Sequence, residues 1–341
     1  METVLGIAGR QSSHQLSDAS QVASARRAAG ELCARQGYDA LSVGEVALLV
    51  TEAATNIIKH AAHGEILLRC LKGGGIEILA LDQGPGMNNF IASSADGTTT
   101  AGSYGVGLGA MQRLASLFDV YSAPGKGTAI LMAYWPKGVA APEASMHCGV
   151  ACLPLPGETA CGDSWSMAWD ATTATVLLAD GLGHGPHAAE ASDLAAEVAM
   201  REPARAAGML MDDVHAALRA TRGAAVAVVC FDMLHERLQF AGIGNISAHL
   251  FQGEQRRQLV SHNGIVGSNM RKVQEFPANW DSTATMVLHS DGLTSRWNID
   301  DYPGLLQCHP ALLAGVLYRD FRRGRDDVSV LVLRDHQGWL P

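Results

Sequence analysis

The stretch "TVLLADGLGHG" (residues 175–185) takes the chain from an apolar run into an aspartate and three glycines. A short apolar run bounded by turn residues is typical of a buried strand. Glycines placed directly after it allow a sharp turn and a close approach of the backbone to a neighbour. A second stretch, "LALDQGPGM" (residues 79–87), has the same layout. We therefore expect two separate sites, one in each half of the chain, each where a strand ends in an aspartate.

The composition is that of an ordinary globular protein with room for about two domains. Of the 341 residues, 48% are hydrophobic and 17% are charged. The net charge of −9 argues against broad nucleic-acid binding, and the basic run "YRDFRRGR" (residues 318–325) is expected to be a solvated helix end. No stretch approaches the ~20 apolar residues of a membrane span, and the N-terminus lacks the features of a signal peptide. We expect a cytoplasmic protein that does not bind a membrane.

The seven cysteines form no regular framework. Cys148, Cys152 and Cys161 are close enough in sequence to suggest a metal site, but no two cysteines have the CxxC spacing. We favour buried, reduced thiols.

The N-terminal part predicts a compact α+β unit of about 135 residues. Apolar spacing predicts helices over 17–37, capped by Ser17 or Asp18, and over 42–62, where Ser42 and Glu45 fit a capping box. Strands are expected at 65–72 and 76–82, joined as a hairpin by "GGG", and at 118–123 and 128–135. A Gly/Ser/Thr-rich loop covers about 83–104 and leads into a helix that begins with glycines. We expect the helices on one face of a mixed sheet.

Polar residues on the second helix favour a binding site. In "TEAATNIIKHA" (residues 51–61), Glu52 and Asn56 are four apart and share one face, with Lys59 and His60 a turn further on. A plain solvated helix face would give the same pattern. The later stretch "YGVGLGAMQRL" (residues 104–114) places three glycines before a helix, where backbone N–H groups can meet phosphate. It does not follow a strand, which argues against a dinucleotide-binding fold.

Taken in order, these elements resemble the GHKL ATPase superfamily over about residues 15–135. The matched positions are Glu52, Asn56, Asp82, Gly84, Gly86, Gly105, Gly107, Gly109 and Thr128. The resemblance implies that Asn56 holds Mg²⁺, Asp82 reads the adenine amino group, Glu52 is the general base and the glycines close over the phosphates of ATP. Lys59 is expected among the nucleotide contacts. The run from "DQGPGM" to "APGKGT" is most similar to serine/threonine switch kinases of the stressosome, and less closely to anti-sigma factor kinases. His60 as a phosphoacceptor is disfavoured against a packed or Mg²⁺-proximal histidine.

The second half has a different pattern, with many strands and a helical pair between them. Strands are expected at 148–155, 164–169, 173–180, 224–232, 237–244, 246–251, 284–291 and 327–334, and helices at about 186–201, 205–221 and 308–321. Two sheets with helices packed outside fit this order. "PKGVAAPEAS" (residues 136–145) has the composition of a linker.

Acidic residues at strand ends indicate a metal site in this half. Asp180 ends "VLLAD", Asp291 ends "MVLHSD", Asp163 lies in "CGDSW", and Asp326 and Asp327 precede the last strand. Buried carboxylates that converge repel one another unless cations lie between them, and Mg²⁺ or Mn²⁺ prefer such oxygen ligands. Two such ions hold a water and a phosphate for in-line attack. For any single aspartate, a turn or cap role is the simpler explanation.

The ordered set "GDSW", "ADGLGHG", "FAGIGN", "HSDG" and "RDDVSV" resembles type 2C metal-dependent protein phosphatases, in the stage II sporulation protein E branch, over about 147–335. The resemblance implies two Mg²⁺ or Mn²⁺ ions and catalytic roles for Asp180 and Asp291. Its metal ligands would be Asp163, Asp180, the carbonyl of Gly181, Asp291 and Asp326, with Asp327 as a less certain partner. His184 and His187 flank the motif; a structural role is favoured over protonation of the leaving group.

Together, these patterns predict two α+β domains: a GHKL-type (Bergerat) ATP-binding sandwich at 1–136, a linker at 137–146, and a type 2C phosphatase α-β-β-α sandwich at 147–341. The resemblance implies a bifunctional kinase and phosphatase of a bacterial partner-switching pathway that acts on Ser or Thr of a STAS-domain antagonist or scaffold protein. The alternative is an ATP-binding module that sequesters a sigma factor or another output protein, fused to a phosphatase. Those activities usually occupy separate chains in the family, whereas here they are fused.

Overall fold

The computed structural model describes residues 2–5, 10–87, 104–142, 145–270 and 273–335. The chain packs as two compact units, and each is interrupted in sequence. The N-terminal unit comprises residues 11–142 and 298–319, and the C-terminal unit comprises residues 1–10, 143–297 and 320–340. The predicted boundaries at 136 and 147 stay a prediction, and these units differ from them at residues 1–10 and 298–319.

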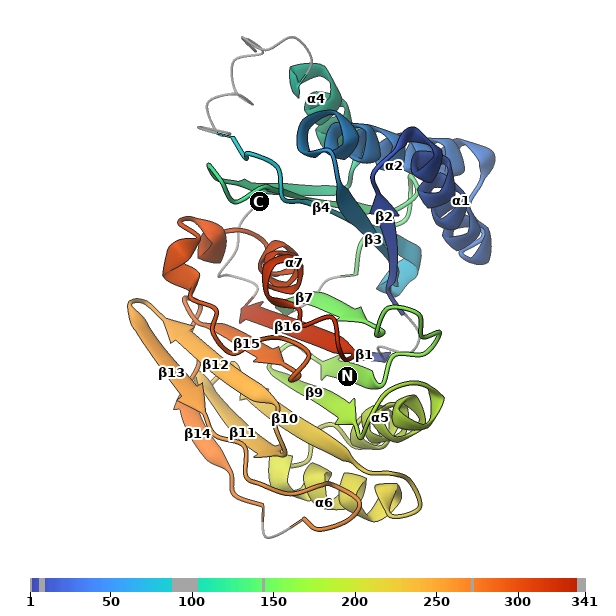
Figure 1. The fold of residues 1–341 in the computed structure, drawn as a ribbon. Helices are drawn as coiled ribbons and strands as arrows, with labels where there is room; N and C mark the ends of the chain where they lie inside the picture. The colour runs from blue at the N-terminus through green and yellow to red at the C-terminus, as the bar shows by residue number, and fades with distance from the viewer. Residues whose placement is uncertain (1, 6–9, 88–103, 143–144, 271–272, 336–341) are drawn as a thin grey trace. The chain divides into compact units, whose positions relative to one another are not determined.

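The N-terminal unit is built on a five-stranded sheet in the order β2-β3-β4-β6-β5 (Figure 1). Its strands are β2 (Ser12–Leu16), β3 (Gly64–Leu71), β4 (Gly75–Asp82), β5 (Leu117–Ser122) and β6 (Thr128–Tyr134). Every neighbouring pair is antiparallel, so the expected mixed sheet is wrong. The "GGG" hairpin is confirmed; its connection is the short 3-10 turn η2 (Lys72–Gly74).

Helices α1 (Ala19–Arg35), α2 (Ala40–Ala61) and α4 (Tyr104–Leu114) pack on this sheet. Asp18 caps α1 in a capping box with Gln21. Helix α2 begins two residues earlier than predicted because the Asp39 side chain accepts a hydrogen bond from the Ser42 N–H. The predicted Ser42–Glu45 capping box is therefore wrong. The Glu45 carboxylate instead accepts a hydrogen bond from the Tyr134 hydroxyl.

Helix α2 has the length and apolar composition of a membrane span, which corrects the expectation that no stretch does. In its most apolar window, 39% of the residues are buried inside the fold. Val46, Leu49, Val50, Ala53 and Ile57 form the predicted stripe, and all five are buried in the core of the unit. A core helix meets the same criteria of length and composition.

Both faces of the N-terminal sheet are covered, which corrects the expectation of helices on one face. On β4, alternate residues such as Ile78 belong to the core shared with α1, α2 and α4. Leu79 and Leu81, which point the other way, are also buried. There they meet helix α7 (Pro310–Phe321): a Cβ on Gly315 would lie 2.6 Å from a methyl group of Leu79. The Tyr318 hydroxyl donates to Glu65 at 3.1 Å, and the 3-10 turns η3 (Ile299–Asp301) and η4 (Leu305–Gln307) precede α7. Arg319 is only 7% exposed, so the expectation of a solvated basic run is wrong at this position.

The C-terminal unit contains two sheets, as predicted. The six-stranded sheet has the order β1-β8-β9-β10-β11-β14, and the five-stranded sheet has the order β13-β12-β15-β16-β7. The first contains β1 (Glu2–Leu5), β8 (Asp163–Trp169), β9 (Thr173–Gly181), β10 (Ala224–Asp232), β11 (Arg237–Ile243) and β14 (Phe276–Asn279). The second contains β7 (Met146–Leu153), β12 (Ser247–Gln252), β13 (Gln255–Leu259), β15 (Thr285–His289) and β16 (Val328–Asp335).

An apolar core that includes Trp165, Phe231 and Trp280 contains residues from both of these sheets. A second core joins the six-stranded sheet to helices α5 (Pro186–Ala199) and α6 (Ala207–Leu218). Strand β1 pairs antiparallel with β8, so the start of the chain belongs to this unit. All seven cysteines are free, as predicted, but only Cys33 and Cys161 are buried, and the other five are half-buried.

Candidate nucleotide and metal sites

Asp82 is held in one orientation at the end of β4. Its Oδ1 accepts hydrogen bonds from the N–H groups of Gly84, at 2.8 Å, and Thr128, at 3.1 Å. Burial raises the pKa of Asp82, although these two hydrogen bonds act in the opposite direction. These two hydrogen bonds fix the carboxylate between the ends of the neighbouring strands β4 and β6. A carboxylate held in one orientation can accept a hydrogen bond from the amino group of a nucleotide base.

Two glycine turns close around this carboxylate. Gly86 has φ of +70°, and a Cβ there would lie 1.9 Å from the Ala123 carbonyl oxygen. Gly127 has φ of +67°, and a Cβ there would lie 2.0 Å from the Asp82 carbonyl oxygen. Both positions therefore require glycine, for backbone conformation and for space. The Thr128 hydroxyl lies 3.0 Å from the Ser122 hydroxyl, so a hydrogen bond also links the end of β5 to the start of β6 here.

Glu52 and Asn56 face helix α4 from α2. A Cβ on Gly107 would lie 2.9 Å from Glu52 Oε2 and 3.8 Å from both side-chain terminal atoms of Asn56. The Asn56 Nδ2 atom is buried and has no hydrogen-bond partner among the described residues. Buried polar groups are normally paired, so an amide left open beside a glycine-rich helix start fits a phosphate oxygen or the shell of a cation. The residues present therefore fit a Mg²⁺–nucleotide.

The remaining predicted nucleotide residues are placed as follows. Lys59 is exposed on the last turn of α2. His60 is half-buried, and burial is the main cause that lowers its pKa. Gly105, Gly107 and Gly109 lie within α4, at its N-terminal end, so the expectation that they precede the helix is wrong. Most of the predicted loop at 83–104, including "DGTTTAGS", lies outside the described residues.

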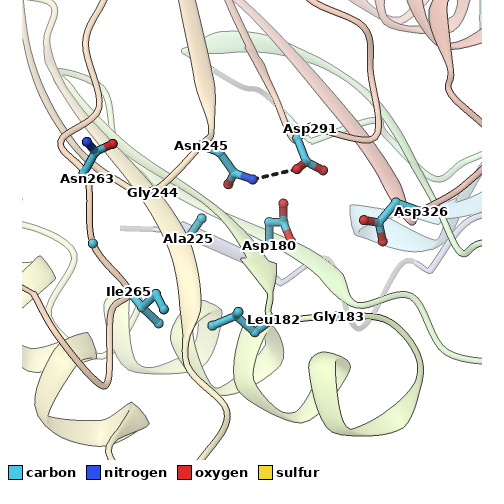
Figure 2. Close-up of a pocket in the computed structure, with 11 residues that line it drawn as sticks. Asp180, Leu182, Gly183, Ala225, Gly244, Asn245, Asn263, Ile265, Asp291 and Asp326 are labelled. Atoms are coloured by element: carbon cyan, nitrogen blue, oxygen red, sulfur yellow. Dashed lines mark hydrogen bonds between the residues drawn. The ribbon is translucent and has the colours of Figure 1, made fainter.

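A cavity of about 480 Å³ opens in the C-terminal unit where β9 ends (Figure 2). Three of the predicted aspartates line it: Asp180, Asp291 and Asp326. Asn245 and Asn263 also line it, and Asn245 donates a hydrogen bond to Asp291 Oδ2 at 2.7 Å. The sequence prediction missed both asparagines, although Asn245 ends the quoted "FAGIGN".

The negative charge around this cavity is poorly compensated by the protein itself. Burial and then the nearby carboxylates of Asp163 and Asp291 raise the pKa of Asp180 to about 9. Burial raises the pKa of Asp163 to about 7, against the hydrogen bond from Ser290. Converging oxygen ligands of this kind fit hard divalent cations. Within the described ranges, no three His, Cys, Asp or Glu side chains form a ready-made metal cage.

The other predicted ligands, Asp163 and Gly181, are not among the residues that line the cavity. Asp163 faces Asp180 across the β8–β9 pair, is 4% exposed and accepts a hydrogen bond from the Ser290 hydroxyl at 2.6 Å. Gly181 is needed for packing, because a Cβ there would lie 2.1 Å from the Ala188 carbonyl oxygen.

Asp326 and Asp327 have different surroundings. Asp327 accepts hydrogen bonds from the N–H groups of Leu155 and Gly162, both at 2.8 Å, whereas Asp326 lines the cavity. This placement favours Asp326 as the ligand. His184 and His187 are exposed, interact with Glu158 and Glu190, and do not line the cavity.

Comparison with known proteins assigns a family to each half. Residues 16–134 match the histidine kinase-like ATPase domain, and residues 170–336 match stage II sporulation protein E. The chain joins these two domains. The predicted two-domain α+β fold, with a GHKL-like and a type 2C phosphatase-like part, is confirmed.

Two curated relatives from Bacillus subtilis each match one half. The serine/threonine-protein kinase RsbT is 29% identical over 117 residues, which are 33% of this chain and 88% of RsbT. The phosphoserine phosphatase RsbX is 24% identical over 139 residues, which are 40% of this chain and 69% of RsbX. The chain is thus homologous to a kinase and to a phosphatase.

Solved structures support the same fold. A chain from a study of the bacterial stressosome has a TM-score of 0.53 and 24% identity, and the match covers 56% of this chain and all of that one. RsbX in complex with magnesium has a TM-score of 0.51 and 18% identity, over 57% of this chain and 98% of RsbX.

Proposed function

We propose that this chain is a bifunctional regulator that phosphorylates and dephosphorylates Ser or Thr of a STAS-domain antagonist in a bacterial partner-switching pathway. The observation that carries this proposal is that each unit brings together its own set of candidate site residues. Asn56 and Asp82 lie in one, and the cavity of Asp180, Asp291 and Asp326 lies in the other. Similarity to a serine/threonine kinase and to a phosphoserine phosphatase supports a regulatory kinase–phosphatase fusion. A cytoplasmic location is part of the proposal.

In the kinase reaction, the first site places ATP for transfer to a protein hydroxyl. Asp82 accepts a hydrogen bond from the adenine amino group, in the orientation fixed by Gly84 and Thr128. The open Nδ2 of Asn56 would donate a hydrogen bond to a phosphate oxygen of the nucleotide, and its Oδ1 would be the ligand of Mg²⁺. Glu52, one turn earlier on α2, accepts the proton of the attacking hydroxyl as general base.

In the phosphatase reaction, the cavity binds the phosphoserine or phosphothreonine. Two divalent cations, when bound, would supply an activated water and neutralise the phosphate charge. Asp180, Asp291 and Asp326 are the cavity carboxylates that would hold them, with Asp163 beside Asp180 on the neighbouring strand. Asn245 fixes the orientation of Asp291 through its 2.7 Å hydrogen bond. This asparagine therefore sets the direction in which one ligand oxygen points.

Both reactions on one substrate at once would only hydrolyse ATP. We therefore expect that partner or nucleotide binding favours one of the two reactions, or that the two units act on different partners. Such a bias is the property that a switch needs.

The decisive experiment follows labelled phosphate from ATP onto the STAS-domain proteins encoded near the gene. Transfer in the presence of Mg²⁺, followed by Mn²⁺-dependent and EDTA-sensitive release from the same protein, is the expected result. Release without transfer, together with a stable stoichiometric complex, would replace the kinase by a sequestering ATP-binding module. Transfer without release would exclude the phosphatase.

A further inference from the structure

Two cysteines of the C-terminal unit lie next to each other, close to a predicted metal ligand. Cys152 is near the end of β7, Cys161 lies two residues before β8, and their sulfur atoms are 3.8 Å apart. Both are thiols in this structure. The Cys152 thiol also donates a weak hydrogen bond, at 3.7 Å, to the carbonyl oxygen of Asp163, the first residue of β8. The pair of thiols therefore contacts the backbone of a predicted ligand.

The loop at 154–162 brings these two thiols together, and Asp327 holds both ends of the loop. One oxygen of the Asp327 carboxylate accepts a hydrogen bond from the Leu155 N–H, and the other accepts one from the Gly162 N–H, each at 2.8 Å. A Cβ on Gly162 would lie 2.5 Å from the second of these oxygens, so the contact leaves no space for a side chain. The proximity of the thiols is thus a property of a fixed loop.

Gly162 connects Cys161 to Asp163 and is bonded on its other side as well. Its carbonyl accepts a hydrogen bond from the Gly181 N–H at 3.0 Å. Asp163 in turn faces Asp180 across the β8–β9 pair. A displacement of the Cys161 sulfur therefore acts on backbone that is bonded directly to the strand end of a cavity carboxylate.

The two thiols differ in their access to solvent. Cys161 is 8% exposed, whereas Cys152 is half-buried, so a small oxidant reaches Cys152 first. The sulfur atoms must approach by about 1.8 Å to reach the disulfide bond length of about 2.0 Å. Because Cys161 is buried and its backbone is held at Gly162, meeting this geometry displaces the segment that leads to Asp163.

We propose that Cys152 and Cys161 form a reversible disulfide on oxidation by hydrogen peroxide, and that this modification weakens the binding of divalent cations in the C-terminal cavity. The effect on cations rests on the proposed function, whereas the disulfide itself does not. One peroxide oxidises the Cys152 thiol to a sulfenic acid and releases one water. The Cys161 sulfur then attacks the Cys152 sulfur, and the oxygen leaves as a second water. The two thiols give up two electrons to the peroxide, and a dithiol reductant reverses the reaction by thiol–disulfide exchange.

The first test detects the disulfide in the full chain. The protein is treated with hydrogen peroxide, remaining thiols are alkylated, and the chain is digested with a protease that cleaves after glutamate. Cleavage after Glu158 separates the two cysteines, so their peptides stay joined only through a disulfide. Mass spectrometry is expected to show joined peptides in the wild type and in Cys148→Ser, which removes the other cysteine of β7. They are expected to be absent in Cys152→Ser and after treatment with dithiothreitol, and their absence in the oxidised wild type overturns the proposal.

The second test measures Mn²⁺ affinity of the oxidised and the reduced chain, by calorimetry and by the Mn²⁺ dependence of p-nitrophenyl phosphate hydrolysis. Oxidation is expected to weaken Mn²⁺ binding about 10–100-fold, with recovery after dithiothreitol. Cys152→Ser treated with peroxide is expected to keep its affinity, and Cys148→Ser to respond like the wild type. A disulfide that leaves Mn²⁺ affinity unchanged overturns the proposed effect on cations. Absence of Mn²⁺ binding to the reduced wild type would instead contradict the proposed phosphatase site, and the joined peptides would still decide whether the disulfide forms.

Discussion

Asn56 offers the cleanest separation of the two proposed activities. Asn56→Ala removes the open buried amide of the first site, and this residue belongs to the N-terminal unit. We expect Mg²⁺-dependent phosphorylation to fall by at least about tenfold, the cost of one lost hydrogen bond to a charged group. Phosphatase activity is expected to stay at the wild-type level. Hydrolysis of a phosphoprotein that fell in parallel with phosphorylation would contradict the assignment of two sites.

Asp180 is the matching position in the second site. It lies in the cavity among other carboxylates, and burial with their repulsion raises its pKa to about 9, so without a cation it binds a proton. Asp180→Ala is expected to reduce Mn²⁺-dependent hydrolysis by more than the 10–100-fold typical of outer-shell changes. Phosphorylation by the N-terminal unit should persist. If hydrolysis in this variant still depended on Mn²⁺ and kept its rate, Asp180 would not be a ligand.

Asn245 is expected to act through Asp291. Asn245→Ala removes the 2.7 Å hydrogen bond to Asp291 Oδ2 and should weaken the apparent Mn²⁺ affinity of the phosphatase about 10–100-fold. Saturating Mn²⁺ is expected to restore most of the rate. Asn263→Ala is the control, because Asn263 lines the same cavity, whereas Asn245 is the asparagine that donates to Asp291. Equal Mn²⁺ dependence in the two variants would show that the bond to Asp291 has no role.

The sequence predicted individual site residues well where acidic side chains stand at the ends of strands. Asp180, Asp291 and Asp326 were expected to converge, and all three line one cavity. The resemblance favoured Asp326 over Asp327, and the structure adds a physical reason, because the Asp327 carboxylate accepts hydrogen bonds from the backbone of residues 155 and 162. Asn245 was missed because an amide after a glycine is an ordinary turn residue until its partner across the fold is known.

The turn of "DQGPGM" depends on a close contact with the turn of "APGKGT". Gly86→Ala places a Cβ 1.9 Å from the Ala123 carbonyl, in addition to the strain of about 1–2 kcal/mol for a positive φ. We expect a clear loss of nucleotide affinity, measured by calorimetry. Gly125→Ala is the matched control, since Gly125 also has φ of +70° but nothing within 4 Å of its added Cβ. Equal losses in both would mean that backbone strain alone, and not the contact, determines affinity.

Among the elements, helices and buried strands were predictable, and polar edge strands were not. Strands β2 ("SSHQL") and β13 ("QRRQL") carry few apolar residues, so no alternation marked them, and pairing with a neighbour determines their structure. Helix α7 was expected near 308–321 and is found at Pro310–Phe321. Its packing site was not predictable, because ten consecutive buried residues give the helix no polar face to orient it.

The interruption of both units in sequence limits how the protein can be divided. A fragment of residues 11–142 lacks α7, which covers Leu79 and Leu81 on the N-terminal sheet. We expect this fragment to bind an apolar dye and to show no cooperative unfolding. The same fragment with residues 298–319 joined by a flexible linker is expected to unfold cooperatively and to bind nucleotide. A stable, nucleotide-binding fragment 11–142 would show that α7 is dispensable for the fold of this unit.

The division into two families was predictable, because each carries local motifs at fixed spacing. The sequence did not predict that residues 1–10 belong to the C-terminal unit and residues 298–319 to the N-terminal unit. Neither "ETVL" at residues 2–5 nor "PALLAGVLYR" at 310–319 has a pattern that differs from an ordinary strand or helix of its own half. The unit in which each segment packs is decided by which apolar surface remains uncovered, and this is known only once the units have folded.

The late position of α7 also affects how the protein is made. About 180 residues separate the end of the first N-terminal segment, residue 142, from the end of α7, residue 321. At ~5–20 residues per second, the ribosome takes roughly 9–35 seconds to synthesise them. For that time the sheet surface of Leu79 and Leu81 has no helix to cover it. A nascent chain of this protein is therefore expected to depend on chaperones, or on fast translation of its second half, to avoid aggregation before α7 is synthesised.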